Sequence, residues 1–250
     1  MAETTARPER GRAEPLPALL TCEHGGYRVP LRYRRLFEGR EEILRSHRGW
    51  DPGALALARR LSRRLRVEMV CSTLSRLVVE LNRSVHHPRL FSEFTRTLSE
   101  AERERILARY YHPYRERVQE AVEERLHGGG PALHLSVHTF SRVVEAGDRT
   151  TEIGLLYDPG VEKERAFCAR WKELLLDRVP GLRIRRNHPN RGTADGLTRH
   201  LRRRFPGRGY LGIELEVRND LLTGDVRERA RVSRALEETL LRLIGDGGAT

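Results

Sequence analysis

The stretch that decides the fold is Leu16-Pro17-Ala18-Leu19-Leu20-Thr21-Cys22-Glu23-His24-Gly25-Gly26, near the start of the sequence. A short apolar run such as Leu16–Leu20 is typical of a buried strand. The two glycines let the backbone turn sharply after it, as happens where the sheet of an α/β fold ends and a crevice opens. We therefore expect His24 at a sheet edge where such folds bind ligands.

Two later segments repeat this arrangement of a strand that carries reactive side chains. Residues 133–140 alternate apolar with polar residues and bring His138 to the strand end. Residues 210–218 alternate in the same way and carry Glu214 and Glu216, which share a face because they are two residues apart. On a solvent-exposed strand these acids would be ordinary amphipathic alternation. On a strand covered by helices they would need a metal, a cation or a catalytic role.

The order of the segments predicts the fold class. Strand signals at 67–72, 77–81, 153–157 and 182–186 alternate with helical signals at 51–65, 99–127 (interrupted at Pro113), 162–178, 197–205 and 226–244. This alternation is typical of an α/β fold with a largely parallel sheet. We expect one α/β domain over residues 16–250, preceded by a disordered tail over residues 1–15.

Composition excludes several classes of protein. The chain is 38% hydrophobic and 33% charged, and no stretch approaches the roughly 20 apolar residues that a membrane-spanning helix needs. The N-terminal tail lacks the apolar segment of a signal peptide. Cys22, Cys71 and Cys168 have no Cys-x-x-Cys spacing, which favours a reducing, cytoplasmic setting and excludes a thiolate zinc cluster.

The net charge of +12 raises the alternative of a basic nucleic-acid-binding protein without catalysis. The excess is nearly all arginine, since Lys163 and Lys172 are the only lysines. These arginines alternate with glutamates along the expected helices, as pairs three or four residues apart do on solvated helix faces. We therefore do not expect nucleic acid as a partner.

Histidines and an acid at strand ends suit a catalytic zinc site. Such a site holds the metal with three protein ligands and leaves one position for water, while a nearby carboxylate transfers the proton. His24 and His138 are the ligand candidates from strand ends. Asp51 is the first candidate for the third ligand, with a helix N-cap as its alternative role. Glu23 is the second candidate, with a salt-bridged turn residue as its alternative role.

Two further segments are candidates for substrate binding. Asn82 and Arg83 follow the apolar run at 77–81, and arginine can grip a carboxylate through two parallel hydrogen bonds. A plain surface charge is the alternative interpretation of Arg83. The loop at 187–196 is polar, contains glycine and proline, and is long enough to suggest a functional role.

At these residues the sequence resembles the N-formylglutamate amidohydrolase family. The resemblance rests on six segments in order, which are Thr21–Gly25, His47–Ala54 (H-x-x-W-D-x-G-A), Ser75–Arg83 (S-R-L-V-x-x-x-N-R), Val137–Phe140, Gly154–Asp158 and Glu214–Arg218. Together they run from about residue 20 to about residue 225 and cover most of the chain.

The resemblance implies a three-layer α/β/α sandwich around a mixed sheet, like that of zinc carboxypeptidases and aspartoacylase-type deacylases. It also implies a hydrolase that uses one zinc ion, or another divalent metal, to cleave the amide bond of an N-formyl or N-acyl amino acid. In this comparison His24 and His138 are metal ligands, Asn82 and Arg83 hold the substrate carboxylate, and Glu216 is the general base.

The chain departs from the carboxypeptidase pattern at one position. That pattern is His-x-x-Glu, and the third residue after His24 is Tyr27. The third ligand must therefore come from elsewhere, either Asp51 or Glu23. A catalytically silent member of the family is the remaining alternative.

Overall fold

The computed structural model describes residues 14–144, 147–148 and 150–247, so the expected disordered tail lies almost entirely outside the described residues. Its centre is a six-stranded sheet with the strand order β2-β1-β3-β8-β6-β7. The strands are β1 (Ala18–Cys22), β2 (Glu68–Cys71), β3 (Ala132–Phe140), β6 (Ile153–Leu156), β7 (Ile184–Arg186) and β8 (Tyr210–Arg218).

The sheet is mixed but largely parallel, as predicted. Strands β2, β1, β3 and β8 run parallel to one another, and β6 pairs antiparallel with β8 and parallel with β7. The carboxyl ends of β1, β3 and β8 therefore meet at one edge of the sheet, which is where α/β folds bind ligands.

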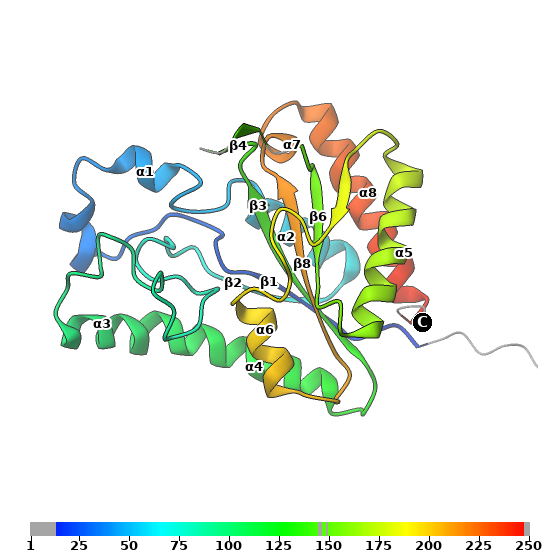
Figure 1. The fold of residues 1–250 in the computed structure, drawn as a ribbon, viewed down its shortest axis with the longest axis horizontal. Helices are drawn as coiled ribbons and strands as arrows, with labels where there is room; N and C mark the ends of the chain where they lie inside the picture. Colours follow the sequence, from blue (N-terminus) through cyan, green and yellow to red (C-terminus); the bar gives the residue numbers. More distant parts are fainter. Residues whose placement is uncertain (1–13, 145–146, 149, 248–250) are drawn as a thin grey trace, which may run out of the picture.

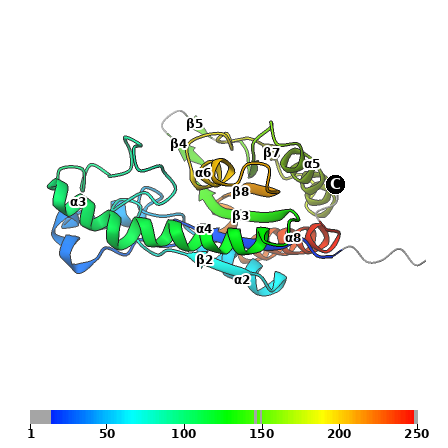
Figure 2. The same cartoon turned by 90° about the horizontal axis from the view of Figure 1, so that it is seen from below.

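Helices cover both faces of this sheet. One face packs against α2 (Ala54–Leu65), α5 (Glu162–Arg178) and α8 (Val226–Gly245), and the other packs against α4 (His112–Leu126) and α6 (Leu197–Arg204). In Figure 1, α5 and α8 lie together to the right of the sheet while α4 and α6 lie below it; Figure 2, viewed from below, brings α4 to the front. The predicted α/β/α sandwich is confirmed.

The two faces of the central strands differ in chemistry. Leu133, Leu135 and Val137 of β3 enter the core formed with α2, α5 and α8. The intervening residues His134 and Ser136 lie on the opposite face, as the two-residue period of a strand requires. Because helices cover that face as well, these polar side chains are buried.

The helical stretch predicted over residues 99–127 forms without the interruption predicted at Pro113, as one continuous helix with a widened turn. It consists of α3 (Glu100–Ile106), a π-helical turn (Leu107–Tyr111) and α4. Ser99 caps its start by accepting the backbone N–H of Glu102. Pro113 cannot donate a backbone hydrogen bond, and the widened turn just before it keeps the helix continuous.

The predicted strand at 77–81 is wrong. This run forms turns instead, with the backbone N–H of Val78 donating to Ser75 and that of Glu80 donating to Leu90. Leu77, Val78 and Val79 are nevertheless buried. A continuous apolar run reports burial, and burial in a folded loop gives the same pattern as burial in a strand.

Short elements complete the described chain. They are a 3-10 helix (Leu31–Phe37), α1 (Glu41–Arg45), the hairpin β4 (Val143–Val144) and β5 (Gly147–Asp148), and α7 (Asp220–Thr223). Within the described ranges, no helix has both the length and the apolar composition needed to cross a membrane.

Candidate metal centre and active site

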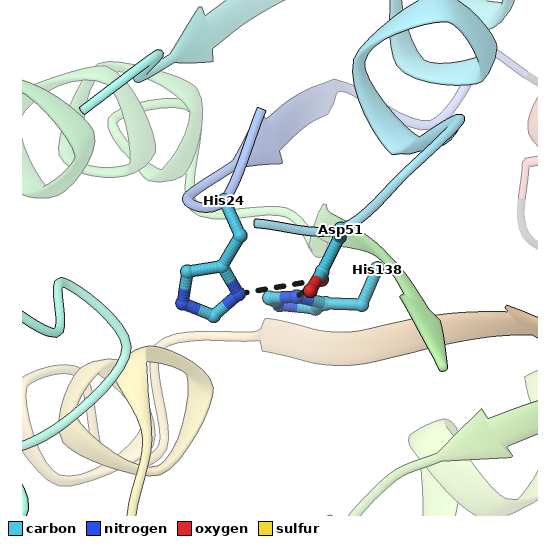
Figure 3. A group of neighbouring side chains, drawn as sticks. All are labelled: His24, Asp51 and His138. Atoms are coloured by element: carbon cyan, nitrogen blue, oxygen red, sulfur yellow. Dashed lines mark hydrogen bonds and ion pairs between the residues drawn. The ribbon is translucent and has the colours of Figure 1, made fainter. Parts of the chain in front are cut away.

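His24, Asp51 and His138 converge at the edge where β1 and β3 end (Figure 3). One ligand atom from each of the three lies within 4.8 Å of the other two. Asp51 Oδ2 lies 3.3 Å from His24 Nδ1 and 3.0 Å from His138 Nδ1. The backbone N–H of Asp51 also donates to the carbonyl of His24, at 2.9 Å, so the two loops are joined directly. Two imidazoles and one carboxylate are a donor set that zinc commonly takes in catalytic sites.

The structure excludes one of the two roles considered for Asp51, that of helix N-cap. Helix α2 begins at Ala54 with Gly53 as its N-cap, and no side chain caps it. The Asp51 carboxylate turns away from the helix toward the two histidines. The N-cap prediction for Asp51 is therefore wrong, and its side chain lies at the candidate metal centre instead.

Each histidine uses its other ring nitrogen on a second buried carboxylate. His24 Nε2 contacts Glu80 Oε1, and His138 Nε2 lies 3.0 Å from Glu23 Oε2. Ser136 Oγ donates to the same Glu23 oxygen at 2.6 Å. Glu23 thus lies behind His138, on the far side of the ring from Asp51, and outside the group of three converging donors.

The charges of this cluster fit a divalent cation. Burial alone would raise the pKa of Asp51 and Glu80, but neighbouring cationic groups outweigh it and hold both values well below the ordinary range. The pKa of Glu23 is lowered in the same way by His138 and Ser136, against its burial. Arg76 pairs with Asp51 and Glu80, so these three carboxylates and this one guanidinium together carry two negative charges, which one divalent ion would neutralise.

The histidines respond to the same surplus of negative charge. Burial opposes protonation of both rings, yet the carboxylates around them raise the pKa of His24 and raise that of His138 well above its ordinary value. The surrounding carboxylates thus favour the protonated form of both rings. Metal binding at such a site exchanges protons for the ion.

Glu216 faces the same site from β8. It pairs in register with His138 across the β3–β8 ladder, and its Oε2 is buried without a hydrogen-bond partner among the described residues. Burial raises the pKa of this carboxyl to about 7. Glu214, two residues earlier, also lines the cavity and accepts a hydrogen bond of 2.7 Å from Thr198. An unpaired buried carboxylate needs an explanation, and an absent ligand is one.

Asn82 and Arg83 reach the cavity from the loop that follows the 77–81 run. The Asn82 side-chain oxygen accepts the backbone N–H of Leu197 at 2.7 Å, which ties this loop to the start of α6. Arg83 Nη1 donates to the backbone carbonyls of Asn82 and Asp195, at 3.1 and 2.6 Å. The guanidinium is therefore fixed on one side by two carbonyls.

These residues enclose a cavity of about 240 Å³. Its wall combines the converging donors, the β8 carboxylates, the Asn82–Arg83 pair and part of the 187–196 loop, and consists of His24, His47, Asp51, Arg76, Asn82, Arg83, His138, Thr139, Phe140, Asn190, Arg191, Ala194, Asp195, Glu214 and Glu216. The structure thus brings together every site residue predicted from the sequence except Glu23, which lies behind His138.

Sequence reasoning missed Glu80. This buried carboxylate contacts His24 Nε2 and forms an ion pair with Arg76, whose guanidinium also reaches Asp51 at 3.1 Å. The available signal was an acid inside the apolar run at 77–81, where an unpaired charge would be costly. That signal indicates a buried partner without saying which residue it is.

Comparisons with known proteins cover most of the chain. The sequence model of the N-formylglutamate amidohydrolase family matches residues 16–223. A crystal structure of a gene product from Agrobacterium tumefaciens is 31% identical, with a TM-score of 0.77, over 92% of this chain and 90% of that one. The N-formylglutamate amidohydrolase from Ralstonia eutropha is 20% identical, with a TM-score of 0.67, over 93% of this chain and 94% of that one. No curated protein matches the chain.

Proposed function

Because the chain belongs to the N-formylglutamate amidohydrolase family, we propose that it hydrolyses the amide bond of an N-formyl or N-acyl amino acid with a bound zinc ion. The observation that carries this proposal is the convergence of two imidazoles and Asp51 beside the unpaired carboxylate of Glu216. The donors suit a metal, and the unpaired carboxylate suits proton transfer.

His24, Asp51 and His138 would hold the ion. When bound there, zinc supplies Lewis-acid activation of the substrate carbonyl and lowers the pKa of the attacking water. Glu23 and Glu80, on the far ring nitrogens, fix which nitrogen of each histidine carries the hydrogen and leave Nδ1 as the donor atom.

Glu216 is the general base in this mechanism. Its carboxylate takes the proton of the attacking water and then gives it to the nitrogen of the departing amine. A pKa near 7 suits both halves of this transfer, because the group neither holds nor releases the proton too strongly at neutral pH.

Asn82 and Arg83 anchor the substrate. Arg83 has one face fixed by the carbonyls of Asn82 and Asp195, and its remaining donors can grip a carboxylate on the amino-acid half of the substrate. This contact would hold the amide at the metal, and such positioning contributes strongly to the rate of hydrolysis.

Metal analysis with a ligand variant tests the proposal. Purified wild-type protein should carry one zinc ion per chain and hydrolyse N-formyl-L-glutamate or a related N-acyl amino acid, and chelation should abolish the activity. His138→Ala should lose both zinc and activity. Hydrolysis that survives chelation and His138→Ala would contradict the zinc mechanism. Zinc binding without hydrolysis of any N-acyl amino acid would indicate a catalytically silent protein.

A further inference from the structure

Glu80 joins three parts of the site through one buried carboxylate. Its Oε1 contacts His24 Nε2 and accepts the backbone N–H of Asn82 at 3.1 Å. Its Oε2 accepts from Arg76, whose Nε and Nη2 lie 2.8 and 2.7 Å away. The partners of this side chain are therefore a metal-donor histidine, a buried cation and the backbone of the segment that carries Arg83.

Arg76 extends this connection to a second donor of the metal centre. The same guanidinium that pairs with Glu80 also donates from Nη1 to Asp51 Oδ1 at 3.1 Å. Glu80 therefore reaches His24 directly and Asp51 through one intervening group. Charge-assisted hydrogen bonds of this kind are short and strongly oriented, so a shift of the Glu80 carboxylate would move both donors.

Glu23 offers a comparison within the same site. It contacts His138 Nε2 as Glu80 contacts His24 Nε2, and it accepts from the hydroxyls of Tyr114 and Ser136 at 2.9 and 2.6 Å. In the described structure Glu23 makes no direct hydrogen bond to the Asn82–Arg83 segment; its link to that segment is His138, whose Nε2 lies 3.4 Å from the Asn82 side-chain nitrogen. Both glutamates therefore contact the Nε2 atom of a candidate metal-ligand histidine, and Glu80 alone also accepts the backbone N–H of Asn82.

We propose that Glu80 is a positioning residue that fixes the ring of His24 and the Asn82–Arg83 segment together, whereas Glu23 orients His138 alone. A carboxylate on the far nitrogen of a ligating histidine fixes its tautomer and ring orientation, and its loss typically weakens metal binding 10–100-fold. The hydrogen bond from Asn82 gives Glu80 its additional effect on substrate binding. This inference rests on the function proposed above.

The test compares Glu80→Ala, Glu80→Gln and Glu23→Ala. Zinc affinity is measured by competition with a chelator, and it should fall about 10–100-fold in all three variants. Glutamine has one acceptor oxygen, so Glu80→Gln deprives either His24 or Arg76 of its acceptor, whichever way the amide turns. Weaker zinc binding by this conservative variant is therefore expected in both orientations.

The KM and the amide hydrogen exchange of Asn82 distinguish the effect of Glu80 from that of Glu23. At saturating zinc, Glu80→Ala should raise the KM for N-formyl-L-glutamate about tenfold, the effect of losing one well-placed hydrogen bond. Glu23→Ala should leave the KM within about twofold of wild type. Amide hydrogen exchange at Asn82 should accelerate in Glu80→Ala and stay unchanged in Glu23→Ala, and this readout requires no substrate.

A matched control addresses general destabilisation. Glu164 is also fully buried and pairs with Arg202, away from the metal donors, so Glu164→Gln should leave zinc affinity unchanged. The inference is overturned if Glu80→Gln binds zinc like wild type, or if Glu23→Ala changes the KM and Asn82 exchange as much as Glu80→Ala does. Wild-type protein that binds no zinc would instead contradict the proposed function, and Asn82 exchange would still decide whether Glu80 fixes that segment.

Discussion

Glu216 combines a cost to stability with the proton-transfer role proposed for it. Its pKa is raised from about 4.5 in the unfolded chain to about 7, so the folded state binds the proton more tightly. The stabilisation associated with that proton is complete at low pH and is lost as the pH rises through 4.5 to 7. Above neutral pH the buried carboxylate opposes folding of the metal-free chain by roughly 3 kcal/mol.

Glu216→Gln should separate the two effects. We expect the variant to keep zinc, to lose at least about 100-fold in hydrolysis, and to unfold at higher denaturant concentration than wild type when both are metal-free at pH 8. Zinc content, turnover of N-formyl-L-glutamate and urea unfolding measure the three quantities. A Glu216→Gln variant that hydrolyses within about tenfold of the wild-type rate would rule out Glu216 as the general base.

The burial of His134 predicts a second dependence of the folding stability on pH, at the acid side. The neutral ring lies buried between the Thr21 hydroxyl at 2.9 Å and the Tyr210 hydroxyl at 2.6 Å, and burial lowers its pKa to about 4. The unfolded chain takes up this proton first, so the stability is present above pH 6.5 and is lost as the pH falls toward 4. At pH 5 the loss is about 2 kcal/mol.

His134→Gln removes this titration. Between pH 7 and pH 5, the unfolding free energy of the variant should therefore fall by about 2 kcal/mol less than that of wild type. Urea unfolding at the two pH values measures the difference. The exposed His127 provides the control, because His127→Gln should follow the wild-type pH dependence. Equal acid sensitivity of His134→Gln and wild type would contradict the assignment.

The helices and strands differ in how well the sequence predicts them. β3, β8 and α5 were predictable within about one residue, because strict alternation or a long helical period identifies an element by itself. The 77–81 run was mispredicted as a strand, and the N-cap alternative for Asp51 was wrong, since burial and local capping preferences do not specify tertiary partners. Glu80 could not be identified because only the folded loop brings it to His24.

The entry into α2 depends on a glycine. Gly53 has a φ of 89°, and a Cβ atom there would lie 2.8 Å from Cβ of Leu222 in α7. A side chain would meet both a backbone penalty and a steric clash, while Asp51 lies only two residues earlier. A change in the backbone at the start of α2 would therefore also displace Asp51 from the candidate metal centre.

Gly53→Ala should destabilise the fold by about 2 kcal/mol or more and weaken zinc binding through displacement of Asp51. Thermal unfolding and chelator competition measure the two effects. Gly128→Ala is the matched control, because nothing lies within 4 Å of a Cβ at that position and it should change neither quantity. If Gly53→Ala were as stable as wild type, the prediction would be contradicted, because α7 would then have accommodated the new methyl group.

The folded chain as a unit should respond to the metal. The three candidate donors lie in the turn after β1, at the entry to α2 and within strand β3, and they converge only in the folded sheet. A ligand that binds only the folded state stabilises it by about 4 kcal/mol when its concentration is about 1,000 times its Kd. Zinc should therefore stabilise the sheet and both helical layers together.

In a protein of this size, that gain corresponds to a rise of roughly 10 °C in Tm. Thermal unfolding with excess zinc and with chelator measures the shift. His138→Ala should unfold at the same temperature under both conditions. A shift of equal size in His138→Ala would place the bound zinc at some other part of the protein.

The polar inner face of the sheet also limits how the enzyme could be improved. Selection for heat resistance alone would favour an uncharged replacement at Glu216, because its buried carboxylate has no hydrogen-bond partner at Oε2 among the described residues and opposes folding. Such a replacement would remove the proposed general base together with the cost to stability. Directed evolution of a hardier enzyme should leave that face unaltered and seek its gains on the opposite face, where α2, α5 and α8 pack against leucine and valine.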